Sequence, residues 1–330
     1  MTSRKLILSG GATYLISLPK EWVTRSGLKT GQDIFINENS DGSLLITPSE
    51  AGPRELRKSE IKTSPAEPPF SLTRRILGAY LRGFTEISVI CDKGFTPTQK
   101  DAIRNLIHPL IGLEIIEESK THLSAKNFLD PKEIPLPKLI QRAHLISKIM
   151  HEEITRAFRH REVKTLNEII SSDDEIDRLY FLTIRELECG IANPKIAKDM
   201  GFPLSEYIYY HLIIKRIEQI GDRITELAKI LKHFNFTVLP KQVLDQLVKL
   251  SEDTYRLHCD AITVTIKKDT ALVSSLLDEC EHLAIRIKVM RDKMKCNSQK
   301  HAVFVDRILE KFSAILGITK HVAEAVITKV

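Results

Sequence analysis

Residues 4–47 read RKLILSGGATYLISLPKEWVTRSGLKTGQDIFINENSDGSLLIT. Short apolar runs separated by glycine turns predict four short strands and one short helix in this stretch. So small a module cannot bury a core by itself. We therefore expect it to form a dimer, with a core that contains Leu15, Trp22, Ile34 and Ile36.

The charge of this module is unevenly distributed. Residues 1–30 carry five basic side chains and one acidic side chain, a net charge of +4, whereas residues 31–50 carry four acidic side chains and no base. A local basic patch, doubled in a dimer, is what neutralisation of DNA phosphates requires. A solvated protein surface gives the same pattern. The candidate DNA contacts are Arg4, Lys5, Lys20 and Arg25.

The overall composition is that of an ordinary globular protein. Of 330 residues, 42% are hydrophobic and 28% are charged, and no apolar run approaches the roughly 18 residues that span a bilayer. Gly10 and Gly11 come too early for the apolar region of a secretory signal. The five cysteines form no CxxC pair. We expect a cytoplasmic protein without membrane insertion, disulfides or a zinc site.

Prolines separate the module from the rest of the chain. Residues 48–69 contain five prolines, with Leu56 and Ile61 as the large aliphatic residues, which is typical of a linker, placed at 49–69. Residues 70–132 then form a small α/β segment, with helices predicted over 72–81 and 97–108 and strands over 87–90 and 113–116. Its basic excess suits DNA or an acidic partner, but we find no phosphate loop or nucleophile in it.

From residue 137 onward the 3.6-residue helical period dominates. Helices are predicted over 137–160, 162–189, 203–233, 240–266, 268–296 and 299–328. They fall into two tandem three-helix bundles, at 137–234 and 238–330. The predicted fold is multidomain α+β and mostly α overall, with the β module at 1–48, the linker and the α/β segment preceding the bundles.

Acidic residues recur at helical spacing in the first bundle. Glu218, Asp222 and Glu226 lie four residues apart and share one face of a helix. Like charges at this spacing destabilise a helix, so a cation is expected to compensate them. That cation is either a metal ion or a neighbouring base such as Arg216 or Arg223.

A second helix could complete an acidic site. Gly221 lies in the middle of the same helix, where the absence of a side chain would let a neighbouring helix approach closely. The preceding helix offers Asp173 and Asp177 on one face. Two such facing helices would make an oxygen-rich site for a hard or borderline cation. A solvated acidic face paired with arginines is the alternative.

Two regions resemble known families. The strand–turn–strand–helix layout of residues 4–47 resembles the AbrB-type swapped-hairpin DNA-binding domain. The segments DDEIDRLY at 173–180 and IEQIGD at 217–222 resemble the first-repeat signatures of PhoU, the phosphate uptake regulator. Together they resemble archaeal PhoU-type regulators that carry their own DNA-binding domain.

The PhoU resemblance implies metal clusters held by E/DxxxD motifs. It implies a divalent or iron-type metal ion in the first bundle, with the ligands Asp173, Asp177, Glu218 and Asp222. No other cofactor is implied. In the second repeat Ser313 and Gly317 replace the two ligands of the third helix, and Glu281 alone remains of the other pair. We therefore do not expect a second cluster.

Enzymatic functions have little support. Glu279 and His282 form a single ExxH, whereas ferritin-like di-iron sites need two, and no nucleophile, phosphate-loop or HExxH signature is present. The helical histidines, among them His144 and His151, are expected at surfaces or interfaces rather than as ligands.

The first hypothesis is a homodimeric, DNA-binding transcriptional regulator of phosphate uptake, whose bundles sense a metal, phosphate or protein signal. The alternative is an adaptor that docks on a phosphate-transporter ATPase or a signalling kinase without specific DNA binding. A metalloenzyme ranks last.

Overall fold

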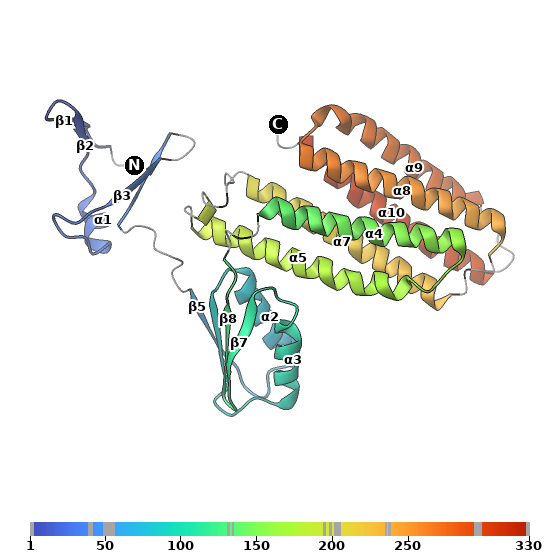
Figure 1. Ribbon diagram of the computed structural model, residues 1–330, viewed down its shortest axis with the longest axis horizontal. Helices are drawn as coiled ribbons and strands as arrows, with labels where there is room; N and C mark the ends of the chain where they lie inside the picture. The colour runs from blue at the N-terminus through green and yellow to red at the C-terminus, as the bar shows by residue number, and fades with distance from the viewer. Residues whose placement is uncertain are drawn as a thin grey trace. The chain divides into compact units, whose positions relative to one another are not determined.

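The chain forms two compact units, Met1–Glu55 and Leu56–Val330, in a computed structural model (Figure 1). The structure describes residues 3–38, 42–48, 57–130, 133, 135–193, 196–197, 200, 206–234, 236, 239–293 and 299–327. Within these ranges the chain is mostly α-helical, as predicted, and its strands lie before the long helices.

The N-terminal unit contains two hairpins and a short helix. Its elements are β1 (Ile7–Ser9), β2 (Thr13–Leu15), α1 (Lys20–Arg25), β3 (Phe35–Glu38) and β4 (Leu44–Thr47). The pairs β1–β2 and β3–β4 are antiparallel and form separate two-stranded sheets. Gly10 and Gly11 turn the first hairpin with φ angles of +63° and +83°, which favour glycine. The predicted order of strands and helix is confirmed.

The core expected for this unit does not form in a single chain. Among the residues of the unit whose burial is described, none is buried. Leu15 remains 51% exposed and Ile36 59% exposed, while Trp22 and Ile34 are half-buried. Two hairpins and a six-residue helix have too little facing surface to enclose these side chains.

The second unit begins with a small α/β domain. Its elements are β5 (Lys58–Lys62), α2 (Pro69–Leu81), β6 (Glu86–Ile90), α3 (Pro97–Ile107), β7 (Leu113–Glu118) and β8 (His122–Asn127). The sheet order is β5-β6-β8-β7, with β5 parallel to β6 and β8 antiparallel to both of its neighbours. Helices α2 and α3 cover one face of the sheet (Figure 1), where Ile61, Ile87 and Leu123 are buried.

Two strands of this sheet were not predicted. Residues 49–56 of the predicted linker lie outside the described residues, but the rest is not a linker, because 58–62 form β5 and Pro69 begins α2. As an edge strand with one buried aliphatic side chain, Ile61, β5 has a polar composition. Proline is favoured at a helix start, where its missing N–H has no partner to lose. In β8 the buried hydrophobic residues of the inner face are Leu123 and Ala125.

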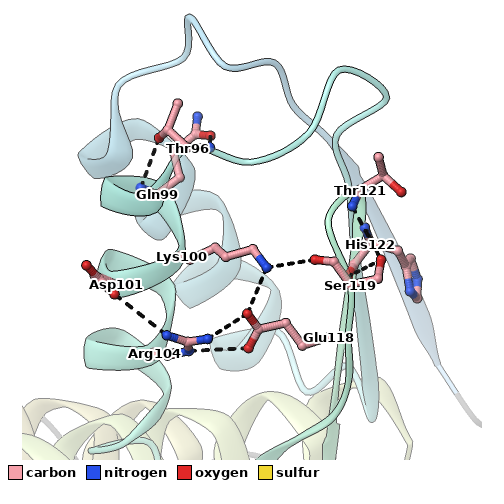
Figure 2. Close-up of polar contacts among 9 residues, drawn as sticks. All are labelled: Thr96, Gln99, Lys100, Asp101, Arg104, Glu118, Ser119, Thr121 and His122. Atoms are coloured by element: carbon pink, nitrogen blue, oxygen red, sulfur yellow. Dashed lines mark hydrogen bonds and ion pairs between the residues drawn. The ribbon is translucent and has the colours of Figure 1, made fainter.

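Charged side chains join α3 to the end of β7 (Figure 2). Glu118 Oε1 lies 3.0 Å from Lys100 Nζ and 2.7 Å from Arg104 Nη2, and Lys100 also donates to the Ser119 carbonyl at 2.8 Å. The bonds from Lys100 and Arg104 hold the pKa of the Glu118 carboxyl below its usual range. The basic excess of this domain is therefore partly neutralised within the domain.

In the described residues six long helices follow, as predicted, with ends close to the expected positions. They are α4 (Leu136–His160), α5 (Leu166–Ala192), α7 (Tyr207–His233), α8 (Lys241–Lys267), α9 (Val273–Lys293), which the 3₁₀ turn η3 (Thr270–Leu272) precedes, and α10 (Gln299–Ile327). We refer to α4, α5 and α7 as the first helix set and to α8, α9 and α10 as the second. Because α7 packs on α10 and α4 on α8, one hydrophobic cluster runs through both sets. Within the described ranges no helix is both long and apolar enough to cross a membrane.

Helix α5 also holds the small α/β domain. The fully buried Arg185 donates from Nη1 to the Tyr80 carbonyl at 2.6 Å, and Arg178 Nε donates to the Pro109 carbonyl at 3.1 Å. Gly83, with φ of +76°, lies so close to α5 that an added Cβ would stand 2.6 Å from Cys189 Sγ. The small domain and the six helices therefore pack as one unit.

Candidate functional site

The four predicted DNA-contact residues are all exposed. Arg4 and Lys5 precede β1, Lys20 begins α1 and Arg25 ends it. None of the four has an ion-pair partner within the described part of the chain. Lys20 and Arg25 are five positions apart along α1, which places them about 140° apart around the helix axis. A single copy therefore does not gather all four into one patch.

Apolar side chains of both hairpins face solvent. Those more than half exposed are Leu6, Ile7, Leu8, Tyr14, Leu15, Ile16, Ile36 and Leu44. A two-stranded hairpin is marginally stable by itself in water, and here neither hairpin extends the other's sheet. Such a concentration of exposed apolar surface marks an interaction site.

The acidic residues predicted on two helices come together between α5 and α7. This acidic cluster consists of Asp173 and Asp177 of α5 and Glu218 and Asp222 of α7. A Cβ on Gly221 would stand 2.9 Å from Ile176 Cδ1 and 3.1 Å from Asp173 Oδ1. The close helix approach predicted at Gly221 is therefore confirmed, and it brings the two pairs of carboxylates face to face.

Burial and mutual repulsion govern the electrostatics of the acidic cluster. Burial, followed by the charge of Asp222, raises the pKa of Asp173 to about 6. Burial, followed by the charges of Asp173, Glu218 and Asp222, raises the pKa of Asp177 to about 7. The three aspartates have no ion-pair partner in the part of the chain that the structure describes. Near neutral pH the ionised carboxylates of the cluster therefore repel one another.

The cluster has the donors of a cation site but not its geometry. Both carboxylate oxygens of Glu218 accept from Lys215 Nζ at 2.8 Å. Of the two bases considered as partners, Arg223 pairs with Glu226 at 2.8 Å, whereas Arg216 donates to an amide oxygen. Carboxylates suit a hard or borderline cation. Yet among the described residues no three or more His, Cys, Asp or Glu side chains are placed to hold a metal ion.

In the second helix set the one corresponding carboxylate is paired with a base, because Glu281 lies 3.2 Å from Lys320 Nζ. Glu279 of the single ExxH, which is not a counterpart of the four predicted ligands, lies 2.6 Å from Arg256 Nη2. A Cβ on Gly317 would meet nothing within 4 Å. The helix packing and the charge pairing at this position both differ from those around Gly221.

Three histidines lie at the seam between α4 and α8, where no site was predicted. His151 and His258 are fully buried with ring centroids 5.9 Å apart, and His144 stands edge-on to His258 at 5.5 Å. Burial lowers the pKa of His151 to about 3 and that of His144, which Lys148 also lowers, to about 4. The seven-residue spacing of the two histidines on α4 was the available signal, because it puts them on one helix face.

Comparison with protein families identifies two domains. Residues 140–231 match the PhoU domain, and residues 7–54 match the family described as antidote-toxin recognition MazE, bacterial antitoxin. A comparison with curated proteins finds no match. The chain therefore carries a PhoU domain over α4, α5 and α7 and a MazE/AbrB-like domain over both hairpins, which confirms both resemblances. Both families are regulatory rather than enzymatic.

Proposed function

We propose that this protein is a homodimeric, DNA-binding transcriptional regulator of phosphate uptake. The PhoU domain suggests control of phosphate uptake, and the MazE/AbrB-like domain suggests DNA binding. The observation that carries the proposal is the exposure of apolar residues in the N-terminal unit, where eight large apolar side chains are more than half exposed. A second copy would cover this apolar surface and double the basic charge beside it.

The DNA contacts would come from Arg4, Lys5, Lys20 and Arg25. Lysine and arginine neutralise phosphates, and arginine can also read guanine edges in the major groove. The small α/β domain is a poorer DNA surface, because its Lys100 and Arg104 are engaged with Glu118. We place the protein in the cytoplasm, where it would meet the DNA.

The helix sets would receive the signal. Asp173, Asp177 and Asp222, with Glu218 released from Lys215, would hold a divalent or iron-type metal ion. Such an ion would supply the positive charge that the acidic cluster lacks. Because α5 also holds the small α/β domain through Arg178 and Arg185, a shift of α5 would reach that domain directly.

A cation titration tests this step. We expect Mn²⁺ or Fe²⁺ to raise the melting temperature of the wild type and a chelator to reverse the rise, because a ligand that binds only the folded state stabilises it. Asp177→Asn with Asp222→Asn should abolish the rise, and Glu281→Gln in the second helix set should preserve it. An equal rise in all three proteins would contradict a site in the acidic cluster.

DNA binding is tested on promoter fragments of phosphate-uptake genes over a series of salt concentrations. Each phosphate contact contributes roughly 0.9 to the slope of log K against log salt. The double variant Arg4→Ala/Lys5→Ala removes two such contacts per copy, so in a dimer the slope should fall by about 3 to 4. Lys93→Ala/Lys288→Ala, which removes two exposed bases elsewhere, should leave it unchanged. No retention of the fragment by the wild type would refute the proposal.

The dimer is tested by light scattering on the whole protein. We expect twice the chain mass of 37.5 kDa for the wild type. Ile7→Asp/Leu15→Asp, which charges the exposed face of the first hairpin, should give the single-chain mass. An exposed apolar residue of the helical unit, Ile285, provides the control, since Ile285→Asp should remain dimeric.

The adaptor hypothesis predicts different results in the same experiments. DNA binding would be weak and insensitive to sequence, and transporter or kinase subunits would co-purify with the protein. The pairing of Lys100 and Arg104 with Glu118 in the small α/β domain, and the absence of ion pairs at the four bases of the N-terminal unit within the described residues, support the regulator over the adaptor.

A further inference from the structure

A basic cleft lies between α7 and α10, where the first helix set meets the second. Its volume is about 570 Å³, within the roughly 300–1,000 Å³ of small-molecule sites. Four permanent cations and one carboxylate line it, which gives a net charge of +3: Lys229, Lys300, Arg307, Lys311 and Glu226. On α10 the three basic residues lie four or seven residues apart and therefore share one face.

The carboxylate does not neutralise this cleft. Glu226 Oε2 already lies 2.8 Å from Arg223 Nη1 and 3.0 Å from Lys311 Nζ. Lys229, Lys300 and Arg307 form no ion pair in the described ranges of the chain, although the charge of Lys229 also acts on Asp173. Three cations that no ion pair in these ranges engages therefore converge on one hollow from two helices.

The apolar residues of the cleft form a second part of the binding surface. The rings of Phe234 and Phe304 stack with centroids 3.7 Å apart, and Ile230 and Val303 lie beside them. Apolar walls lower the local dielectric constant, which strengthens the attraction between these cations and an anion. Phe234 is half-buried, so part of its ring remains available to a planar group of a ligand.

We infer that the basic cleft binds a small multivalent phosphoanion, the class that includes pyrophosphate and nucleoside triphosphates. Several converging cations favour an anion with several charges, and lysine and arginine are the common donors to phosphate oxygens. The volume and the aromatic ring favour the larger members of the class. Binding of the anion does not depend on the proposed function. Only its regulatory consequence rests on that function, because an anion held by α7 and α10 bridges the two helix sets.

Isothermal titration of the full-length protein with ATP, pyrophosphate, orthophosphate and sulfate tests this inference. We expect ATP and pyrophosphate to bind one per chain and more tightly than orthophosphate or sulfate. Lys300→Ala/Arg307→Ala should weaken their binding by about tenfold or more, the loss expected from two charge contacts. Both side chains are exposed, so the variant should keep its melting temperature. Lys288→Ala removes an exposed lysine of α9 and should bind as the wild type does.

Several outcomes would overturn the inference. Equal weakening by Lys288→Ala would mean diffuse attraction to a basic surface, and equal binding of sulfate would remove the preference for phosphoanions. Tighter binding of hexaglutamate than of pyrophosphate would assign the cleft to an acidic peptide instead. Promoter retention, measured on the same variants, separates this inference from the proposed function, because loss of anion binding with intact retention refutes the cleft alone.

Discussion

In the first helix set three aspartates of α5 and α7 face one another and form no ion pair within the described residues, whereas in the second set Glu281, the one corresponding carboxylate, pairs with Lys320. The two sets otherwise have three long helices each and contribute to one hydrophobic cluster. Gly221 brings its helix against α5, while Gly317 has open space before it. The PhoU match covers the first set and ends before α8 begins.

In these helices the residues that build the core and the residues of the acidic face are different ones. The apolar stripe that builds the shared core is present in both sets, because each must cover the other. The acidic face adds nothing to that core and costs stability through repulsion. We therefore propose the first set, in which three aspartates form no ion pair within the described residues, as the one that would receive a signal.

Proton binding to the buried histidines of the seam that joins the two sets should produce the largest single effect. His151 and His258 are buried as neutral rings, with pKa values below those of the unfolded chain. Below about pH 6.5 the unfolded chain binds protons that the folded chain excludes, so stability present above that pH is lost as the pH falls. From pH 7 to pH 5 we expect His151 to remove about 2 kcal/mol from the free energy of unfolding and His258 to act in the same direction. Urea unfolding at several pH values measures the sum of this loss and the opposite contribution of Asp173 and Asp177, whose raised pKa values favour the folded state on acidification.

Variants isolate the contribution of the seam from that of other titrating groups. His151→Leu should make the unfolding free energy about 2 kcal/mol less sensitive to the same pH change. His211→Leu, at an exposed position, should have the wild-type pH dependence. If both variants follow the wild type, the two helix sets do not depend on neutral histidines at their seam.

The two glycines provide the next test, with effects of opposite sign. Gly221→Leu forces a side chain against Ile176 and Asp173, and overpacking of this kind should lower the free energy of unfolding by about 1–3 kcal/mol. Gly317→Leu meets no nearby atom at Cβ and should raise it by up to about 0.8 kcal/mol, because leucine favours helix more than glycine does. Thermal and urea unfolding measure both. Equal destabilisation would show that the two helix sets are packed alike at these positions.

Single charge removals should give the smallest effects. Asp177→Asn relieves repulsion in a half-exposed cluster and should raise the free energy of unfolding by roughly 0.5 kcal/mol at pH 7.5. Glu281→Gln breaks the pair with Lys320 and should lower it by up to about 0.5 kcal/mol. Urea unfolding of both variants beside the wild type compares them. Changes of the same sign would mean that the first set neutralises its carboxylates as the second does.

Sequence patterns predicted those features of this protein that depend on residues close together along the chain. The long helices follow from apolar periodicity, and the first turn follows from Gly10 and Gly11. Asp173 and Asp177, like Glu218 and Asp222, are four residues apart and therefore share a helix face wherever the helix lies. Strands β5 and β8 were missed because an edge strand and a strand with few large apolar residues have little periodic signal.

The sequence by itself determined the long helices, the acidic helix faces and the order of strands and helix in the N-terminal module. Only the tertiary structure decided which faces meet. It showed that α7 packs closely against α5 at Gly221, that Lys215 donates a hydrogen bond to Glu218, and that basic residues of α7 and α10 line one cleft. These contacts join residues far apart in sequence, and their geometry depends on helix packing, which no local pattern encodes.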